Sequence, residues 1–330
     1  MKVAVIGVGS MGINHLRVYT ELDDIEVVGA SDVSPDRLEM VSSRFSVKTY
    51  SNYQELIEKE KPDAVSITVP TSDHEKVAAF CLEHGVHLLV EKPIAATVEE
   101  GKRLIALAEK VNRQLMVGHI IRFNPAIQSL KQRLENGDLG KIFQVFCRRA
   151  GPFPARIRDV GVVIDLAPHD VDIMRFLTGM DPMRVYAETE QRIHTDHEDL
   201  LFGLLRFPDG ITGALEINWL TPTKMRETLV LGEKGLFRVD DLMQDLYYFE
   251  NPQAIGELWS PFRAIRGVSE GSMTRYSIPR QEPLKAELQA FIQAIKNGEK
   301  VPVTGQDGLE ALRLSLALVE SGKTHQVIEV

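Results

Sequence analysis

The first 120 residues alternate between short apolar runs and longer segments whose apolar residues recur at helical spacing. The apolar runs, rich in β-branched residues, cover residues 2–6, 26–31, 48–50, 64–69, 87–90 and 114–118, and the helical segments cover 11–22, 35–43, 53–59, 75–84 and 97–112. Such alternation is typical of βαβ units, in which helices join parallel strands. We therefore expect a doubly wound parallel sheet of the α/β class.

The pattern changes after Asn124 and Pro125, because strands then follow strands. After a helix to about residue 136, apolar alternation marks residues 141–149, 185–192, 200–207, 212–220, 228–231, 235–240 and 246–250. Helical spacing marks residues 165–177, 283–297 and 307–321. This pattern predicts an α+β domain with a mostly antiparallel sheet. We expect the two domains to cover residues 1–122 and 123–330.

Composition and charge narrow the classes of function. The chain has 330 residues, with 38 Lys and Arg against 47 Asp and Glu, and a net charge of −9. That balance argues against a general binder of nucleic acid or of anionic membranes. Cys81 and Cys147 are too few for a disulfide framework or a thiolate zinc site. We see neither a signal-peptide pattern nor an apolar run near the ~18 residues of a membrane helix, so we expect a cytoplasmic protein.

A glycine motif follows the first predicted strand. Gly7, Gly9 and Gly12 give the spacing G-x-G-x-x-G between that strand and the next helix. The first glycine allows a tight turn, the second lets the backbone approach a pyrophosphate, and the third allows close packing of the helix. The amino end of that helix favours negative charge. We therefore expect an N-terminal Rossmann domain that binds a nicotinamide dinucleotide.

Asp32 indicates which dinucleotide binds. It follows the second predicted strand, where an acidic residue accepts hydrogen bonds from the adenosine ribose. A carboxylate there repels a 2′-phosphate, and the next residue is Val33 rather than a basic residue, so NAD is preferred over NADP. Arg37 on the following helix moderates this preference.

Lys92 is a candidate for contact with a substrate. It follows the fifth predicted strand, at the carboxyl edge of the sheet where doubly wound folds bind ligands. An exposed, solvated lysine is the alternative, because lysines are common after strands.

Asp165, His169 and Asp172 are candidates for proton transfer. They are spaced i, i+4 and i+7, so a helix places them on one face. A histidine one turn from a carboxylate can take a hydroxyl proton, although a merely polar helix face is the alternative. Pro168 favours a helix that begins near it, with Asp165 in a capping position. One histidine without a cysteine does not favour a metal site.

Five motifs together resemble the Gfo/Idh/MocA oxidoreductase family. In chain order they are Gly7-x-Gly9-x-x-Gly12, Pro70-Thr71-x-x-His74, Glu91-Lys92-Pro93, Gly118-His119-x-x-Arg122-Phe123-Asn124-Pro125 and Asp165-x-x-x-His169-x-x-Asp172. The resemblance covers nearly the whole chain. It implies a Rossmann domain followed by an open-faced α+β domain, and oxidation of a secondary hydroxyl of a sugar by hydride transfer.

The resemblance also assigns roles. It implies that Lys92 and His169 act at the reacting carbon and that Asp165 holds the sugar or the histidine, with His169 as the expected base because a lysine is ordinarily protonated. The expected cofactor-binding residues are Gly7, Gly9, Ser10, Met11, Gly12, Asp32, Arg37, Pro70, Thr71, His74, Glu91 and Lys92. The expected substrate-binding residues are Lys92, His119, Arg122, Asn124, Arg149, Arg156, Arg158, Asp165 and His169.

Two segments, residues 151–159 and 218–224, most resemble the UDP-N-acetylglucosamine 3-dehydrogenases of this family. The implied reaction converts the 3-hydroxyl of that nucleotide sugar to a ketone. Arg148, Arg149, Arg156 and Arg158 could grip its diphosphate, or could pair with local carboxylates. The alternatives are a dehydrogenase of inositol or of a free sugar, and a non-catalytic regulator that binds a dinucleotide.

The expected partners are a small sugar or nucleotide sugar and further copies of the chain. A bare apolar sheet face is a liability in water, so we expect the second-domain sheet to form a homodimer or homotetramer. We expect no nucleic-acid or membrane partner.

Overall fold

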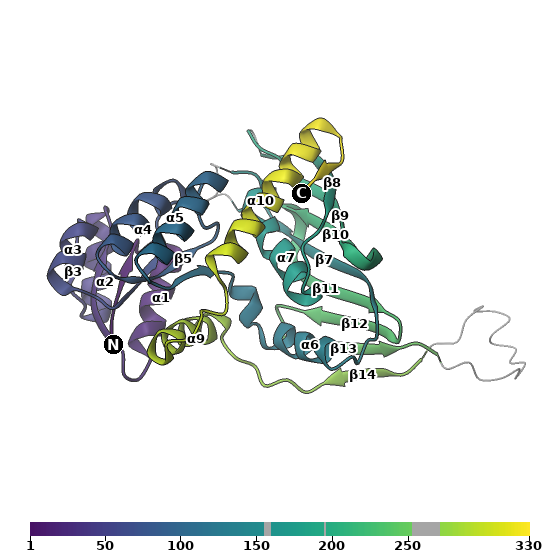
Figure 1. The fold of residues 1–330 in the computed structure, drawn as a ribbon, viewed down its shortest axis with the longest axis horizontal. Coiled ribbons are helices and arrows are strands. Elements are labelled where there is room, and N and C mark those ends of the chain that lie inside the picture. Colours follow the sequence, from purple (N-terminus) through teal and green to yellow (C-terminus); the bar gives the residue numbers. More distant parts are fainter. Residues whose placement is uncertain (155–159, 195, 253–270) are drawn as a thin grey trace, which may run out of the picture. The chain divides into compact units, whose positions relative to one another are not determined.

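The structure is a computed structural model that describes residues 1–154, 160–194, 196–252 and 271–330. The chain forms two compact units, whose elements are labelled in Figure 1. The first unit comprises Met1–Phe123 and Glu282–Arg313, and the second comprises Asn124–Gln281 and Leu314–Val330. Helix α10 (Gly305–Thr324) contributes to both units. Among the described residues, no helix is both long and apolar enough to cross a membrane.

The first unit is built on a six-stranded parallel sheet. Its strands are β1 (Lys2–Ile6), β2 (Glu26–Ser31), β3 (Thr49–Tyr50), β4 (Ala64–Ile67), β5 (His87–Glu91) and β6 (Leu115–Gly118). Their order is β3-β2-β1-β4-β5-β6, so the direction of strand addition reverses between β1 and β4. Ligands of doubly wound sheets bind outside the carboxyl ends of the strands at such a reversal. The predicted parallel α/β domain is confirmed.

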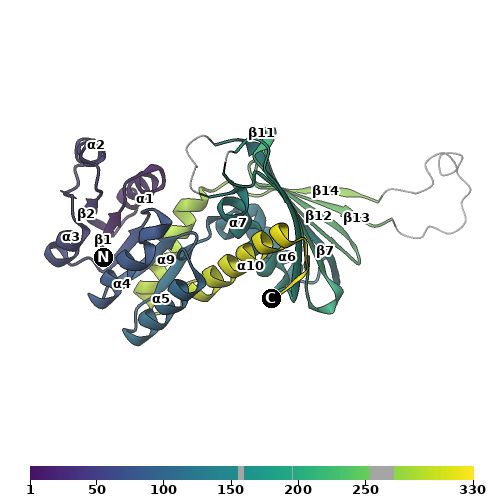
Figure 2. The same ribbon diagram turned by 90° about the horizontal axis from the view of Figure 1, so that it is seen from above.

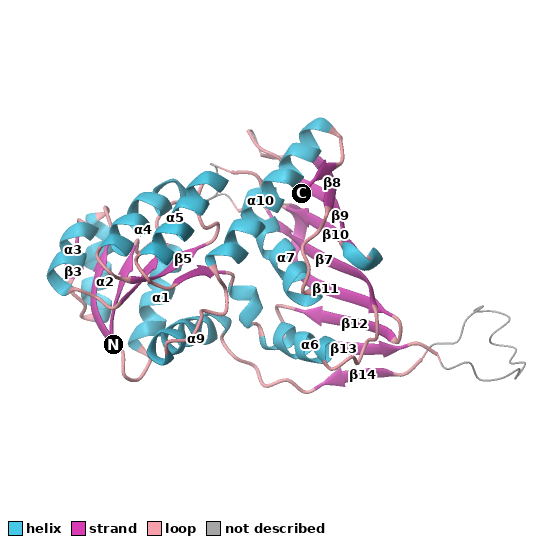
Figure 3. Cartoon of the chain, in the orientation of Figure 1, coloured by secondary structure: helices cyan, strands magenta, loops and turns pink. Residues whose placement is uncertain are grey.

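Five helices connect these strands, as Figure 3 shows: α1 (Ser10–Thr20), α2 (Pro35–Phe45), α3 (Tyr53–Glu60), α4 (His74–Glu83) and α5 (Val98–Lys110). Strands β4 and β6 are buried along their whole length, as expected for strands inside a sheet that is covered on both faces. Ser66 is the only polar residue of β4, and it is fully buried.

Helix α9 (Pro283–Asn297) corrects the expected domain boundary. The sequence analysis assigned it to the second domain, but Leu284, Leu288 and Phe291 are buried in the apolar core of the first unit. Their i, i+4 and i+7 spacing predicts the helix and its apolar face. Because the same spacing does not reveal which core that face joins, the sequence alone could not place α9.

The second unit is built on a nine-stranded sheet. Its strands are β7 (Ile142–Pro152), β8 (Arg184–Glu190), β9 (Leu200–Arg206), β10 (Thr212–Asn218), β11 (Leu220–Gly232), β12 (Gly235–Asp240), β13 (Asp245–Glu250), β14 (Met273–Tyr276) and β15 (Ile328–Glu329). Their order is β14-β13-β12-β11-β7-β10-β9-β8-β15. Among the described strands of this second sheet, one neighbouring pair is parallel, β7 with β10. The predicted mostly antiparallel sheet is confirmed. The sequence analysis missed β14 and β15, which are too short to show alternation.

Helices α6 (Pro125–Glu135) and α7 (Val162–Thr178) pack on one face of this sheet, as does the last part of α10 (Figure 2). In β9, Leu201 and Leu205 are buried, whereas the side chains of Phe202 and Leu204 are 52% and 53% exposed. This alternation is expected of a strand with one covered face. Within the described residues, the opposite face of the sheet has no helix over it, as the predicted open-faced arrangement requires.

Candidate functional site

Gly7, Gly9 and Gly12 form the predicted turn between β1 and α1. Gly7 has a φ of 87°, which favours glycine, and its N–H donates to the Ser31 carbonyl at 2.7 Å. A Cβ atom on Gly12 would lie 1.9 Å from the Gly7 oxygen, so a side chain there would push α1 away from the turn. Near the missing Cβ of Gly9, the structure describes one atom within 4 Å, Nη1 of Arg37 at 3.7 Å. This bare backbone at a helix amino end fits a pyrophosphate.

Asp32 lies next to the turn and is 7% exposed. Its Oδ2 accepts a hydrogen bond from the Val8 N–H at 2.8 Å, and its Oδ1 accepts one from the Ser34 N–H at 2.9 Å. Nη1 of Arg37 lies 3.4 Å from Oδ2, and the Arg37 side chain is half exposed. Because a carboxylate offers about four acceptor positions, Asp32 keeps capacity for ribose hydroxyls.

His74 begins α4, after the loop that contains Pro70 and Thr71. Its Nδ1 lies 2.9 Å from the carbonyl oxygen of Pro93, and its Nε2 lies 3.0 Å from that of Val69. Burial lowers the pKa of His74, and these two backbone contacts partly oppose the shift. Since both ring nitrogens face protein carbonyls, the ring of His74 braces two loops, and its expected contact with the cofactor stays a prediction.

Glu91 ends β5 and precedes Lys92. Its Oε1 lies 3.1 Å from Nε2 of His15, and its Oε2 accepts a hydrogen bond from the Lys92 N–H at 3.2 Å. Gly118 on β6 leaves room for this carboxylate, because a Cβ there would lie 3.1 Å from Cδ of Glu91. Burial acts to raise the pKa of Glu91, but the hydrogen bond and charge of His15 and the charge of Lys92 lower it below its ordinary value. Glu91 is therefore a carboxylate.

His119 and Arg122 follow β6, and Arg122 lies in the short helix η2 (Ile120–Phe123). Both side chains are buried. Nη2 of Arg122 donates to Oδ1 of Asp307 at 3.0 Å. Burial acts to raise the pKa of Asp307, but Arg122 and hydrogen bonds from Thr304 hold it below its ordinary value. This ion pair fixes Arg122 against the start of α10.

Helix α7 carries Asp165, His169 and Asp172, and it begins earlier than expected. Its first residue is Val162, so Pro168 lies inside the helix and Asp165 is in the first turn rather than at the cap. Glu198 satisfies the amino end of α7, because its backbone oxygen accepts from the Val162 N–H at 2.9 Å and its Oε1 accepts from the Val163 N–H at 3.3 Å. Sequence reasoning missed Glu198, since no local pattern links it to a helix start more than 30 residues away.

Arg149 pairs with carboxylates inside the second unit. Its Nε and Nη2 each donate to Asp170 at 2.8 Å, and Nη2 lies 3.5 Å from Asp241. Arg149 is 4% exposed, and burial raises the pKa of Asp241 to about 7 despite the nearby guanidinium. The structure places Arg149 in a buried ion cluster, the alternative that the sequence left open, and its expected contact with substrate stays a prediction.

The remaining predicted residues divide into three groups. Asn124 is buried and caps α6, with its Oδ1 accepting from the Ala126 N–H and its Nδ2 donating to the Asp241 carbonyl, and its expected contact with substrate stays a prediction. Arg148 pairs with Glu216 at 2.8 Å. Arg156 and Arg158 lie outside the described residues.

Arg226 on β11 is a candidate that the sequence analysis missed, because the predicted strand began two residues later. Its Nη1 donates to the carbonyls of Ala150 at 2.6 Å and Met225 at 2.7 Å. Burial and the charge of Arg149 lower the pKa of Arg226 to about 10, and Asp165 is among the acids that act in the opposite direction. Among the described residues, no carboxylate oxygen lies within 4.0 Å of this guanidinium. Arg226 is thus a half-buried cation within electrostatic reach of Asp165.

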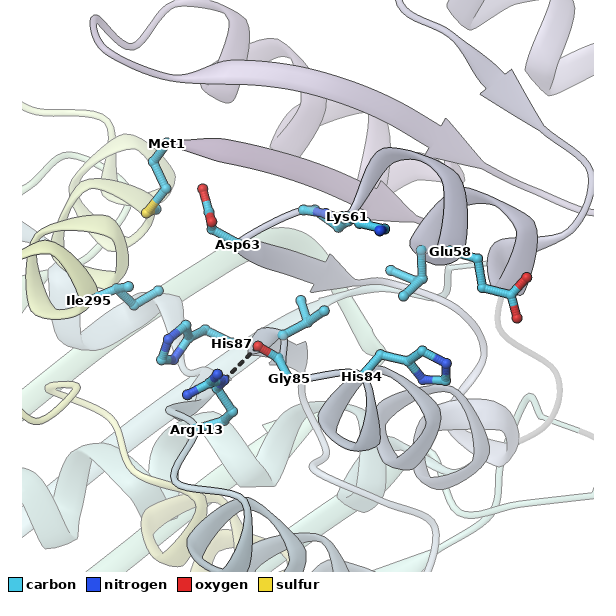
Figure 4. Close-up of a pocket in the computed structure, with 12 residues that line it drawn as sticks. Met1, Glu58, Lys61, Asp63, His84, Gly85, His87, Arg113 and Ile295 are labelled. Carbon is cyan, nitrogen blue, oxygen red and sulfur yellow. Dashed lines mark hydrogen bonds between the residues drawn. The ribbon is translucent and has the colours of Figure 1, made fainter.

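A cavity of about 670 Å³ lies at the opposite, amino-terminal edge of the parallel sheet (Figure 4). Met1, Asp63 and His87 line it, at or next to the starts of β1, β4 and β5. Its polar groups bond within the protein: Arg113 donates to the Gly85 carbonyl, and Asp63 accepts from the Lys2 N–H. This cavity is therefore separate from the dinucleotide turn at the carboxyl edge.

Comparison with known proteins agrees with the residue pattern. Residues 1–119 match the domain family described as an oxidoreductase family with an NAD-binding Rossmann fold, and residues 127–238 match the GFO/IDH/MocA C-terminal domain.

Two relatives align over most of their length. The chain is 29% identical to the UDP-N-acetylglucosamine 3-dehydrogenase of Acidithiobacillus ferrooxidans, over 96% of this chain and 95% of the relative. It is 28% identical to the myo-inositol 2-dehydrogenase of Thermotoga maritima, over 97% of this chain and 96% of the relative.

The fold is also similar to a solved structure of the Acidithiobacillus ferrooxidans enzyme, with a TM-score of 0.87 and 27% identity over 98% of both chains. Both halves of the chain match, and the parallel sheet precedes the mostly antiparallel sheet as the family requires. The chain therefore belongs to the Gfo/Idh/MocA family of oxidoreductases.

Proposed function

We propose that this protein is an NAD-dependent dehydrogenase that oxidises the 3-hydroxyl of UDP-N-acetylglucosamine to a ketone. The observation that carries the choice of an anionic substrate is Arg226, a half-buried guanidinium without a carboxylate in salt-bridge range among the described residues. A buried unpaired cation is costly, and a phosphate oxygen would compensate it. Similarity to a UDP-N-acetylglucosamine 3-dehydrogenase supports the same substrate class.

The proposed reaction removes a hydride and a proton from one secondary alcohol. When bound, the nicotinamide supplies the hydride acceptor. Gly7, Gly9 and Gly12 hold the pyrophosphate on bare backbone. Lys92 stays positively charged beside the Glu91 carboxylate and stabilises the developing alkoxide. His169 takes the hydroxyl proton, and Asp165, one turn earlier on α7, orients the sugar or the histidine.

We propose NAD rather than NADP as the working cofactor. Asp32 supports this, because its carboxylate is fixed by two backbone N–H groups and would repel a 2′-phosphate. Arg37 lies 3.4 Å from Oδ2 of Asp32 and opposes that repulsion in part. The preference therefore depends on the Asp32 charge.

Oxidation of an inositol or a free sugar is the second candidate. Similarity to a myo-inositol 2-dehydrogenase favours it, at an identity close to that of the nucleotide-sugar enzyme. An inositol carries no phosphate, so with this candidate the described acids that act on Arg226 are Asp170, Asp241 and Asp165 alone. Mass spectrometry of ligand retained by the purified protein separates the two, as does turnover with UDP-N-acetylglucosamine, N-acetylglucosamine and myo-inositol in parallel.

We also propose that the protein forms a homodimer or homotetramer through the open face of the second-unit sheet. Cross-strand pairing places Leu204, Ala214, Phe146 and Leu229 side by side on four adjacent strands of this face. Leu204 is 53% exposed in the single chain. Covering such an apolar row with the same row of a second subunit would bury it on both sides.

Replacing Lys92 or His169 by Ala should lower kcat for UDP-N-acetylglucosamine with NAD by at least about 100-fold, because each variant removes a group from the proton-transfer step. Absorbance of NADH measures the rate. The matched control is Lys76→Ala, at an exposed position of α4, which should retain full activity. Undiminished turnover in both site variants would refute the assigned roles.

Replacing Asp32 by Ser should raise the KM for NAD about tenfold or more, since a charged hydrogen bond to ribose is worth about 1.5–3 kcal/mol. The same change should improve the relative use of NADP, because it removes the charge that repels a 2′-phosphate. Steady-state kinetics with both cofactors give the ratio. Asp36→Ser, at an exposed position on α2, should leave the ratio unchanged. An unaltered ratio in the Asp32 variant would contradict this basis for cofactor choice.

Replacing Leu204 by Glu should shift the protein toward the monomer, because a charge in the middle of a buried apolar row costs several kcal/mol unless it is paired. Light scattering measures the mass. Met243→Glu, in the 49% exposed turn after β12, is the matched control and should keep the native mass. A wild-type protein that is monomeric at working concentration, or a Leu204 variant of unchanged mass, would rule out this interface.

A further inference from the structure

Four polar side chains are completely buried in the apolar core of the first unit. Tyr19 and His15 lie on α1, Ser66 lies on β4, and Glu287 lies on α9, and each is 0% exposed. Burying a polar group costs free energy unless it is hydrogen-bonded. Such a group of residues inside a core therefore calls for a physical account.

Three of these residues connect to Glu91 through a continuous series of hydrogen bonds. The Tyr19 hydroxyl lies 2.9 Å from Oγ of Ser66, and this Oγ lies 3.1 Å from Nδ1 of His15. Nε2 of His15 lies 3.1 Å from Oε1 of Glu91. The other carboxylate oxygen of Glu91 accepts from the Lys92 N–H. The series thus runs from the core to the peptide of Lys92.

The two ends of this series have fixed directions. Ser66 is the only described partner of the Tyr19 hydroxyl, and burial raises the pKa of Tyr19, so Tyr19 keeps its proton and donates to Ser66. A carboxylate only accepts, so Nε2 of His15 carries a proton and donates to Glu91. In the middle, Oγ of Ser66 has one proton and two lone pairs, so it can pair with Nδ1 of His15 as donor or as acceptor.

Glu287 lies close enough to raise the pKa of Tyr19 further, yet it does not join the series. Neither of its carboxyl oxygens has a hydrogen-bond partner among the described residues. Burial and the nearby charge of Glu91 both raise the pKa of Glu287 well above its ordinary value, which favours its neutral form. The pKa of Glu91 is lowered instead, so Glu91 carries negative charge in this cluster, next to Lys92.

We infer that Tyr19, Ser66 and His15 are positioning residues: their series of hydrogen bonds fixes the Glu91 carboxylate and, through it, the position of Lys92. The inference rests on the proposed role of Lys92 in the reaction. The Lys92 N–H donates to the same carboxylate, so the position of Glu91 also affects the direction that the backbone takes after β5.

Nitrogen NMR of histidine side chains in the whole protein tests the donor to Glu91 without any substrate. Long-range proton–nitrogen correlation shows which ring nitrogens carry protons, and His15→Gln assigns the signal by removing it. We expect Nε2 of His15 to carry a proton, because it faces the Glu91 carboxylate. His84 is an internal reference whose proton should be on Nδ1, because that nitrogen faces the Phe80 carbonyl at 2.8 Å. A His15 without a proton on Nε2 would overturn the inference even if the proposed substrate is wrong.

Rescue by a conservative substitution tests the link to Lys92. His15→Leu removes the donor to Glu91, so kcat should fall about tenfold while the KM for NAD stays nearly unchanged, because Lys92 is then held less exactly at the reacting hydroxyl. His15→Gln, whose amide can donate to Glu91, should restore much of the wild-type kcat. The control Asn14→Ala changes the exposed neighbour on α1 and should have no effect. Equal kcat in all of these proteins, or an equal loss in the Leu and Gln variants, would show a purely structural His15.

Discussion

The close approach of α1 to the turn after β1 is the contact on which the first unit depends. Gly12 lies so near the Gly7 carbonyl that any side chain there would collide with it. At the amino end of α1 the backbone of Gly9 has open space beside it, as a pyrophosphate requires. The contact between Gly12 and Gly7 also sets the depth of the same helix in the core, where His15 and Tyr19 meet Ser66. One steric constraint therefore serves both the dinucleotide turn and the surroundings of Glu91 and Lys92.

The second unit holds its buried arginines in two ways. Arg149 lies between Asp170 and Asp241, so carboxylates in direct contact compensate its charge. Arg226, by contrast, uses its Nη1 on two carbonyls, and Asp170, Asp241 and Asp165 act on it through longer-range charge. Arginines with and without a contacting carboxylate look alike in a sequence, but the second kind gains more by binding an anion. This difference is the physical reason to propose a phosphate-bearing substrate.

Much of the fold could be predicted because the spacing of apolar residues along the chain differs between helices and strands. The glycine turn, the strand before Asp32 and the helix face of Asp165 and His169 all follow from spacing within a short segment. The spacing of residues does not show which element an apolar face packs against, or which residue a polar side chain pairs with. The core joined by α9, the cap that Glu198 gives to α7 and the pairing of Arg149 all depend on residues far away in the chain. The hydrogen bonds of His15 belong to the same class, since Ser66 and Glu91 are 51 and 76 residues away from it.

The most direct test of the central claim follows the hydrogen on carbon 3 of the sugar. UDP-N-acetylglucosamine with deuterium at that carbon should transfer the deuterium to NAD, and mass spectrometry should find one deuterium in the NADH formed and none at carbon 3 of the keto product. The rate should also fall relative to the unlabelled substrate when hydride transfer limits turnover. NADH without the label, or an oxidised sugar that retains it, would contradict hydride transfer from carbon 3.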